Sequence, residues 1–530
     1  MAFLRSHAPV LLVLLFAALT SVAFVRQAER EPTISDQLGY LYAGERLAAG
    51  HGLTYEDDNN ETAGPYFALY AFQIRREGSA AHYLGFPPGF PILLAAAAWM
   101  TGAPAAMHAV VPLLAAALLL VTYWLGKLMS EDPWVGLLSA VAMLATPAFW
   151  QYGTAAWSEI PAALTVALGV ALFLASRKSE RIVALSLAAA AVLSFGHFIR
   201  YTNVVFLAAL AAYELYTARH RLWTERRRWV FWIATAAGLA LIPLFNHVYY
   251  GGALVTSYSP AHGWYPLPAF SLAYALGPSF VDGYSLIASL RTLWNNFPVF
   301  LMLAPFGWWM LPAGSRVLTA AAVGFGLLAY VFYAFAPTGI NARFLLPILP
   351  FIAVAIAQFV VTVLRRLDRP IVTGAVGLSL VIGLCFIIMA QRDTLLSRDA
   401  NNRSVVALAR ELSAPLEANA VVMSYAYNDM IAIYGNRSVL NYRRIPASDS
   451  DLGRYRLEML EPCLVGSTGR LLDQAIPVYY VADRQPSYWG SLEILERHFT
   501  LEAVRSDPTV YRVIERTGGP AGDESQCGFP

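Results

Sequence analysis

The sequence predicts a polytopic α-helical membrane protein with a smaller α/β domain at its C-terminal end. Long apolar runs recur from residue 8 to residue 390, and only 14% of the 530 residues are charged, against about 25% in an average soluble domain. Residues 391–530 are more polar. We therefore expect a membrane domain over 1–390, which includes a first outer loop (26–104), and a soluble domain over 391–530.

The first apolar run, residues 8–25, follows the basic residue Arg5 and is long enough to span a bilayer. These features also suit a cleaved signal peptide. Because many further apolar runs follow, we interpret residues 8–25 as an uncleaved transmembrane helix and keep cleavage as the alternative.

Arginine-rich connections at 176–181, 217–228 and 365–369, together with Arg316, separate the later apolar runs. The positive-inside rule places all of them in the cytoplasm. A chain that starts in the cytoplasm and crosses about eleven times satisfies this rule and leaves the C-terminal domain outside. The predicted crossings after the first are 105–126, 136–153, 154–176, 182–197, 199–216, 229–250, 295–313, 317–336, 343–364 and 371–390.

One apolar segment, residues 87–102, does not fit this count. It opens with prolines and is short for a span, and counting it as a crossing would break the charge pattern. We interpret it as an interfacial or re-entrant segment.

The C-terminal region shows the patterns of a mixed α/β domain. Cys463 and Cys527 both lie in it, so an extracytoplasmic location would allow a disulfide between them. The residues alone leave that pairing open. The predicted elements are a helix over 402–413, strands over 420–425 and 477–483, a helix over 488–499 and a strand over 509–516.

Asp36 follows the first apolar run almost at the membrane surface. Ser35 or Asp36 can cap a helix that ends near Ala49, ahead of Gly50 and Gly52. Capping is a common role for aspartate. The alternative is that Asp36 takes part in chemistry at the outer face.

A second outer acid, Glu159, stands two residues before Pro161 at the start of a predicted crossing. The helix dipole stabilises an acid in this position, which would be a purely structural role. Acids near membrane depth are also costly and often functional. The predicted topology puts Glu159 and Asp36 on the same side of the membrane.

Two outer arginines, Arg200 and Arg343, break the positive-inside trend. Either one alone could simply extend toward the lipid headgroups. If both face one cavity, they form a phosphate clamp, because a guanidinium binds phosphate through two parallel hydrogen bonds. His197 lies close to Arg200 in the sequence and joins it as a candidate phosphate ligand.

Aromatic and histidine residues suggest an acceptor or donor cleft. The segment 258–270 is rich in aromatic residues and contains His262 and Tyr265, while Tyr40 and His82 belong to the first outer loop. Aromatic faces suit a sugar or a lipid, but aromatic residues at a membrane interface are also ordinary belt residues.

Cofactor motifs are scarce in the sequence. It contains no phosphate-binding P-loop, no zinc-protease motif and no serine-hydrolase motif. The acidic stretch 56–61 and the Asp-Ser-Asp triplet 449–451 leave a divalent cation open without forming a convincing cluster. We predict no certain cofactor and no nucleic-acid partner.

The order of these features resembles the type-C glycosyltransferases, in particular the family 39-like bacterial relatives of protein O-mannosyltransferases and lipid A aminoarabinose transferases. The resemblance covers most of residues 1–390. It rests on the acid after the first helix, on the α/β domain placed outside, and on three segments: GFPPGFPILLAAAAWMTG (85–102), SEIPAAL (158–164) and NARFLLPILP (341–350).

The resemblance implies an inverting transfer of a sugar from a polyprenyl-phosphate donor at the outer face of a bacterial cytoplasmic membrane. Asp36 would bind the acceptor and act as base, Glu159 would be the second outer acid, and Arg343 and Arg200 would bind the donor phosphate. The acceptor would be a hydroxyl of a lipid, a glycan or a protein.

One departure from the family concerns the first acid. Protein mannosyltransferases carry two adjacent acids there, whereas Asp36 stands between Ser35 and Gln37. A protein acceptor is therefore less expected. The alternative functions are a transporter or flippase of lipid-linked sugars and a membrane-anchored sensor or assembly protein.

Overall fold

The computed structural model describes residues 2–255 except 73 and 76–80, residues 295–329 except 298, residues 339–367, and residues 370–527 except 443–447, 450–453, 456–458, 483–489, 520–521 and 523. The chain divides into two compact units. The helical unit comprises Met1–Arg30, Ala97–Ile242 and Pro268–Arg398, and the α/β unit comprises Glu31–Ala96, Pro243–Leu267 and Asp399–Pro530.

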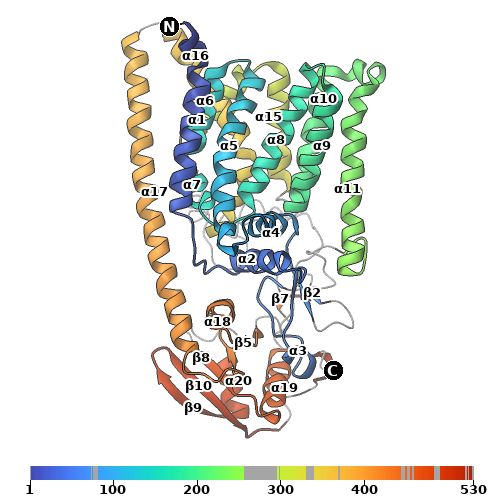
Figure 1. The fold of residues 1–530 in the computed structure, drawn as a ribbon, viewed down its shortest axis with the longest axis vertical. Helices are drawn as coiled ribbons and strands as arrows, with labels where there is room; N and C mark the ends of the chain where they lie inside the picture. The colour runs from blue at the N-terminus through green and yellow to red at the C-terminus, as the bar shows by residue number, and fades with distance from the viewer. Residues whose placement is uncertain are drawn as a thin grey trace. The chain divides into compact units, whose positions relative to one another are not determined.

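Long helices that run side by side make up the helical unit (Figure 1). Helices α11 and α17 begin in this unit and continue into residues of the α/β unit. The helices are α1 (Ala2–Arg26), α5 (Met107–Ser130), α6 (Pro133–Leu144), α7 (Pro147–Gly153), α8 (Glu159–Lys178), α9 (Ile182–Ile199), α10 (Val205–Thr224), α11 (Trp229–Tyr250), α14 (Ala304–Met310), α15 (Ala313–Leu328), α16 (Leu349–Leu367) and α17 (Pro370–Ser413), with 3₁₀ segments η2 (Tyr201–Val204), η6 (Val299–Leu303) and η8 (Gly339–Ile348).

Seven helices in the described part of the chain are long and apolar enough to cross a membrane. The pair α6 and α7, bent by 69° between them, makes an eighth candidate span. The chain is thus a multi-pass membrane protein, as predicted. Helices α10, α14 and α15 coincide with three more predicted crossings but fall short of the same criterion, so the count of eleven stays a prediction. Segment 87–102 forms helix α4 (Gly89–Thr101), which has 13 residues and is short for a span.

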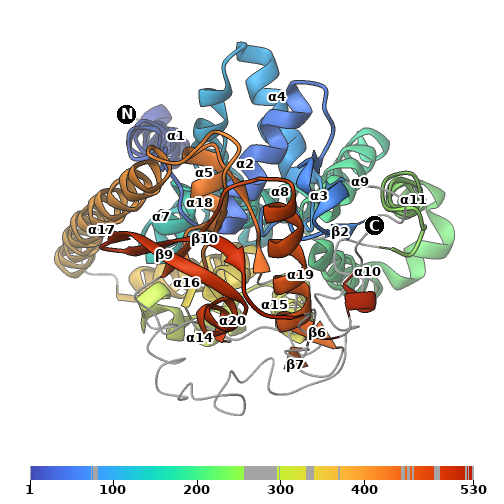
Figure 2. The same cartoon turned by 90° about the horizontal axis from the view of Figure 1, so that it is seen from below.

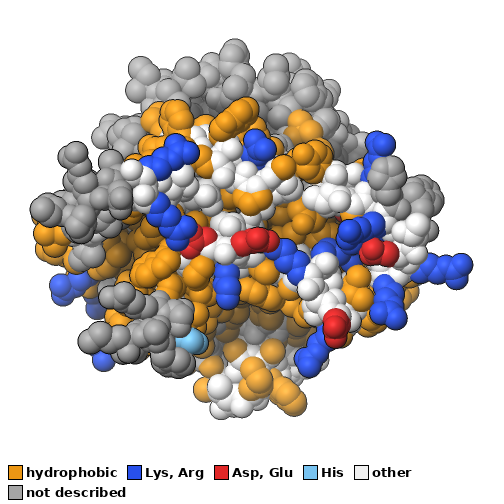
Figure 3. Space-filling view, turned by 90° about the horizontal axis from the view of Figure 1, so that it is seen from above, with side chains coloured by type: hydrophobic (Ala, Val, Ile, Leu, Met, Phe, Trp, Pro, Cys, Tyr) orange, Lys and Arg blue, Asp and Glu red, His pale blue; other side chains and the backbone are white. Residues whose placement is uncertain are grey.

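The basic connections gather at one end of the helical unit, called here the arginine-rich end. The buried carboxylate of Glu214 lies 2.9 Å from Arg177 and 3.1 Å from Arg228. Arg365, at the end of α16, lies 2.5 Å from Asp132 at the start of α6. Figure 3 shows lysine and arginine side chains spread over the face at this end. Buried or partly buried acids at this end therefore form ion pairs with three of the four basic segments that the positive-inside rule grouped together.

The α/β unit is built on a mixed five-stranded sheet (Figure 2). Strand β4 is parallel to its neighbours β5 and β8, whereas β10 is antiparallel to its neighbours β8 and β9, so the central strand β8 has one parallel and one antiparallel neighbour. The strands, in sheet order, are β5 (Ser438–Val439), β4 (Val421–Met423), β8 (Val478–Ala482), β10 (Thr509–Arg516) and β9 (Phe499–Ser506), and the helices are α18 (Asn428–Tyr434), α19 (Leu460–Asp473) and α20 (Ser491–His498).

The predicted α/β class of the C-terminal region is confirmed, and every predicted element there has a counterpart. Several elements were missed, among them α18, β5 and α19. Strand β9 was missed too, because the prediction continued the helix to residue 499, whereas α20 ends at His498 and β9 follows directly.

Residues 31–96 pack with the C-terminal residues to form the α/β unit. The sequence gives no indication of this packing. Ala63, Tyr66 and Phe67 lie in one apolar core with strand and helix residues of the C-terminal region. This segment contains α2 (Ser35–Ala48), α3 (Asn59–Thr62) and a small antiparallel sheet of β1 (Thr54–Tyr55), β3 (His82–Tyr83) and β2 (Ile74–Arg75).

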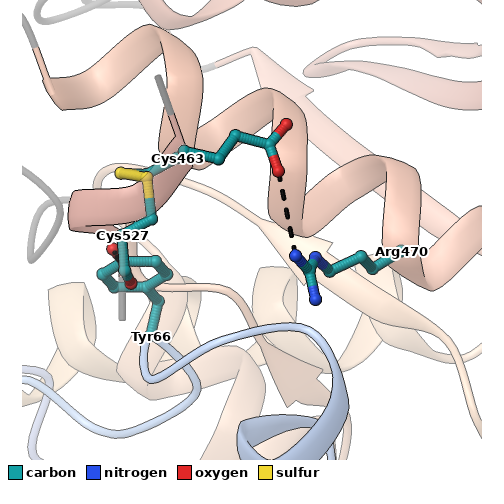
Figure 4. The surroundings of a disulfide bond; sticks show 5 residues. Tyr66, Cys463, Arg470 and Cys527 are labelled. Carbon is teal, nitrogen blue, oxygen red and sulfur yellow. Dashed lines mark hydrogen bonds and ion pairs between the residues drawn. A yellow bond between two sulfur atoms is a disulfide. The ribbon is translucent and has the colours of Figure 1, made fainter. Parts of the chain in front are cut away.

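A disulfide joins Cys463 to Cys527 in the α/β unit (Figure 4). The hydroxyl of Tyr66 donates a hydrogen bond of 2.7 Å to the carbonyl oxygen of Cys527. The disulfide therefore ties the end of the described chain both to α19 and, through Tyr66, to the first loop.

Candidate active site

Glu159 is the centre of a buried cluster of charges in the helical unit. It is the first residue of α8, and its side chain is fully buried. The Oε1 atom of its carboxylate lies 2.5 Å from Nη1 of Arg200 and 3.0 Å from Nε of Arg343. The structure thus brings together three of the residues predicted from the sequence.

The helix connections explain why these three residues meet. Helix α8 starts at Glu159, and α9 runs back beside it and ends at Ile199, so that Arg200 follows in an extended conformation. Arg343 lies on η8, which packs against α8 and leads into α16. Since α8 ends at Lys178 in the arginine-rich end, the cluster lies at the opposite end of the helical unit.

Aromatic rings hold both guanidinium groups in place. The Cζ atom of Arg343 lies 3.7 Å from the ring centroid of Trp157, and Cζ of Arg200 lies 4.5 Å from that of Phe344. Such contacts are favourable because the face of an aromatic ring carries partial negative charge, and burial strengthens them. Arg200 also donates a hydrogen bond of 3.3 Å to the hydroxyl of Ser158.

The charges of the cluster favour an anion. Two guanidinium groups and one carboxylate leave one net positive charge, and the side chains are between 1% and 12% exposed. A guanidinium has five N–H donors, so the same arginine can contact a carboxylate oxygen and a phosphate at once. Phosphate suits this arrangement because its oxygens match the fork of donors.

Trp157, Ser158 and Phe344 were not predicted as site residues. Ser158 and Phe344 stand next to Glu159 and Arg343 in the segments that carry the resemblance, and Trp157 directly precedes the first of these segments. This closeness in sequence is the signal that would have identified them. His197, predicted as a phosphate ligand, contacts the ring of Tyr201 at 5.4 Å between centroids.

Asp36 lies in the first turn of α2, in the α/β unit, and is partly buried. Ile34 occupies the cap position of this helix, so the prediction that Ser35 or Asp36 does so is wrong. The predicted end near Ala49 is confirmed. An acid in the first turn interacts favourably with the helix dipole even without capping. Whether Asp36 acts together with Glu159 stays a prediction.

Within the first loop, α2 packs closely against Ala71 because residue 39 is a glycine. A Cβ atom at this position would lie 2.1 Å from the Cβ of Ala71, which no side chain tolerates. Tyr40 is buried next to it, with ring centroids 4.9 Å from both Phe86 and Phe90. The structure thus places this predicted cleft residue in the packing between α2 and α4.

His82 is buried on β3, where its Nε2 atom lies 3.0 Å from the carbonyl oxygen of Pro65. It therefore helps to fix the first loop. His262 and Tyr265 lie outside the described residues, as does the whole segment 258–270. Among the residues that the structure describes, no three His, Cys, Asp or Glu side chains form a group that could hold a metal ion.

Comparison with known proteins supports the resemblance found in the sequence. Residues 68–252 match the family described as dolichyl-phosphate-mannose-protein mannosyltransferase. No curated protein sequence matches the chain.

Two solved structures share the fold. ArnT from Cupriavidus metallidurans in the apo state superposes with a TM-score of 0.55 at 14% identity, covering 96% of this chain and 98% of that one. The archaeal oligosaccharyltransferase AglB from Archaeoglobus fulgidus, in complex with an inhibitory peptide and a dolichol-phosphate, superposes with a TM-score of 0.53 at 12% identity, covering 96% of this chain and 74% of that one. The chain therefore has the fold of the type-C glycosyltransferases.

Proposed function

We propose that the chain is an inverting glycosyltransferase that moves a sugar from a polyprenyl-phosphate donor to a hydroxyl acceptor. The observation that carries this proposal is the contact of one Glu159 oxygen with both Arg200 and Arg343. The family match and the shared fold support a membrane glycosyltransferase that uses a lipid-linked donor. In this proposal the two arginines bind the donor phosphate, and Glu159 positions them.

The chemistry follows from the charge of the cluster. An acceptor hydroxyl attacks the anomeric carbon from the face opposite the phosphate, and the bond between that carbon and the phosphate oxygen breaks. The electron pair leaves with polyprenyl phosphate, whose growing negative charge the guanidinium groups stabilise. The acceptor proton passes to a carboxylate, and we assign this role to Asp36. Attack from the opposite face inverts the anomeric configuration.

The arginine-rich end indicates which side of the membrane the cluster around Glu159 faces. If the positive-inside rule holds, that end faces the cytoplasm and the cluster around Glu159 faces the outside. Nucleotide sugars would then be out of reach, and a donor carried on a membrane lipid would supply the sugar. We propose the outer face of a bacterial cytoplasmic membrane as the location, with a lipid or a glycan as the favoured acceptor.

Binding of polyprenyl phosphate, compared with the same polyprenol without phosphate, tests the proposal on the purified chain. The wild type is expected to prefer the phosphate, and Arg343→Gln to lose that preference. Arg366→Gln removes a charge at the arginine-rich end and is the control, because it leaves the cluster intact. Equal binding of the two lipids by the wild type would contradict the donor site.

A transfer assay tests the role of Asp36. With a radiolabelled polyprenyl-phosphate sugar and membrane lipids or glycans as acceptors, Asp36→Asn should bind polyprenyl phosphate like the wild type yet transfer no label. Transfer by this variant at the wild-type rate would remove Asp36 from the mechanism and leave the phosphate site untouched.

A further inference from the structure

A mostly apolar cavity of about 660 Å³ lies between α10, α14 and α15 of the helical unit. Tyr216 of α10 and Trp308 of α14 form its sides, and α15 lines it from Ala313 to Leu328. At 1.5 Å per residue this stretch of α15 extends about 22 Å, which exceeds half of a hydrocarbon core of about 30 Å. The cavity is thus long enough for a hydrocarbon chain within one leaflet.

The cavity opens toward the surroundings of the helices. Tyr216, Phe325 and Leu328, which line it, are exposed although they are large and apolar. At Gly324 a Cβ atom would meet nothing within 4 Å, so this position faces open space. In a membrane-spanning unit, an open apolar cavity of this kind is accessible to lipid.

Basic side chains lie at one end of this cavity. Arg316, in the first turn of α15, lines it and stacks its guanidinium on Trp309 at 5.6 Å. A second cavity of about 390 Å³ shares Tyr216 with the first and is lined by Arg219 and Arg221. The backbone of α10 departs from helical geometry at Ala218, immediately before these two arginines.

We propose that the two cavities together bind one anionic phospholipid, with an acyl chain along α15 and its phosphate near Arg316 and Arg219. An apolar cavity beside a second cavity lined by two arginines matches the two parts of such a lipid. Basic pockets between transmembrane helices are a known way to bind anionic headgroups. The site lies at the arginine-rich end, opposite the cluster around Glu159, so it is distinct from the proposed donor site.

The full-length protein, purified in detergent and stripped of lipid, can be titrated with dioleoyl-phosphatidylglycerol and with dioleoyl-phosphatidylcholine while bound lipid is counted by native mass spectrometry. The wild type should retain one phosphatidylglycerol per chain in preference to phosphatidylcholine. Arg316→Gln should weaken the binding of phosphatidylglycerol about fivefold, the effect of one arginine near a membrane surface. Gly324→Leu, which fills the apolar cavity, should abolish binding of both lipids.

Arg366→Gln is the matched control, because it removes a charge at the same end without lining either cavity, and it should bind like the wild type. Equal binding of the two lipids by the wild type, or wild-type binding by Gly324→Leu, would overturn the proposal. If Gly324→Leu does not fold, the double variant Arg316→Gln/Arg219→Gln decides the question. An unchanged preference for phosphatidylglycerol in that variant would also overturn it.

Discussion

Glu159 and Arg343 form a buried ion pair, with 3.0 Å between the carboxylate Oε1 and the guanidinium Nε. The same oxygen contacts Arg200. A carboxylate engaged in this way is a poor general base, because transfer of a proton to it would weaken both contacts. We therefore regard Glu159 as the residue that positions the two arginines.

Removing the charge of Glu159 should destabilise the folded protein strongly. Glu159→Gln removes the carboxylate charge that both buried guanidinium groups contact, and breaking a buried ion pair on one side typically lowers the free energy of unfolding by about 3–5 kcal/mol. The melting temperature of the purified protein should fall clearly, and added polyprenyl phosphate should restore part of the loss by supplying negative charge. Glu131→Gln is the control, because Glu131 pairs with Lys178 at the surface, where such pairs contribute less than about 1 kcal/mol. Equal melting of the two variants would contradict the role assigned to Glu159.

Trp157 should affect donor binding through Arg343. A desolvated cation–π contact contributes about 2 kcal/mol, which corresponds to about a thirtyfold change in an equilibrium constant. Trp157→Leu should therefore weaken the binding of polyprenyl phosphate by one order of magnitude or more, because Arg343 loses the ring that orients it. Trp157→Phe keeps an aromatic face and should retain most of the affinity. If both variants bind alike, the ring is only a packing residue.

The sequence could predict this cluster only in part. Charge patterning was enough to place Glu159, Arg200 and Arg343 at one end of the membrane helices. The basic loops mark the cytoplasmic side, and the number of crossings between a loop and a residue determines the side on which that residue lies. It could not show that one oxygen of Glu159 contacts both arginines, since that depends on how α9 and η8 pack against α8. The capping role foreseen for Asp36 failed for a local reason, because α2 begins one residue early and places Ile34 at the cap.

The α/β class of the C-terminal region, predicted over 391–530, was readable from strand and helix patterns, and β10 matched its predicted limits. The packing of the first loop into the same unit was not. Tyr66 and Phe67 meet the C-terminal core only through contacts between residues far apart in sequence, and no local pattern encodes such contacts.

Asp57 should make the stability of the α/β unit depend on pH. Burial raises the pKa of this carboxyl above its ordinary value of 3.8, although Ser438 and Asn59 donate hydrogen bonds to it. A folded-state pKa above the unfolded value means that the folded state binds the proton more tightly. The stabilisation is therefore complete below 3.8 and is lost as the pH rises through the raised pKa.

Hydrogen exchange can test this dependence by comparing the wild type with Asp57→Asn at each pH. Asparagine keeps the hydrogen-bonding shape and does not titrate, so the variant should gain protection relative to the wild type as the pH rises from about 4 to 7. The effect should be confined to peptides that contain residues 54–60 and 436–440. Glu61→Gln removes an exposed acid nearby and should show no such trend. A constant difference between wild type and Asp57→Asn at all pH values would contradict the assignment.

Breaking the disulfide between Cys463 and Cys527 should loosen the first loop as well as the C-terminal end. The bond closes a loop with a sequence separation of 64 residues, for which the chain-entropy model gives about 4 kcal/mol of stabilisation. Because Tyr66 donates its hydroxyl hydrogen bond to the carbonyl of Cys527, a mobile Cys527 also deprives Tyr66 of its acceptor. The variant Cys463→Ser/Cys527→Ser should therefore show faster hydrogen exchange at residues 63–67, which are distant from both cysteines in sequence. Cys385→Ser is the control, since Cys385 is a free thiol on α17. Unchanged exchange at 63–67 in the double variant would mean that the first loop is held by its apolar contacts alone.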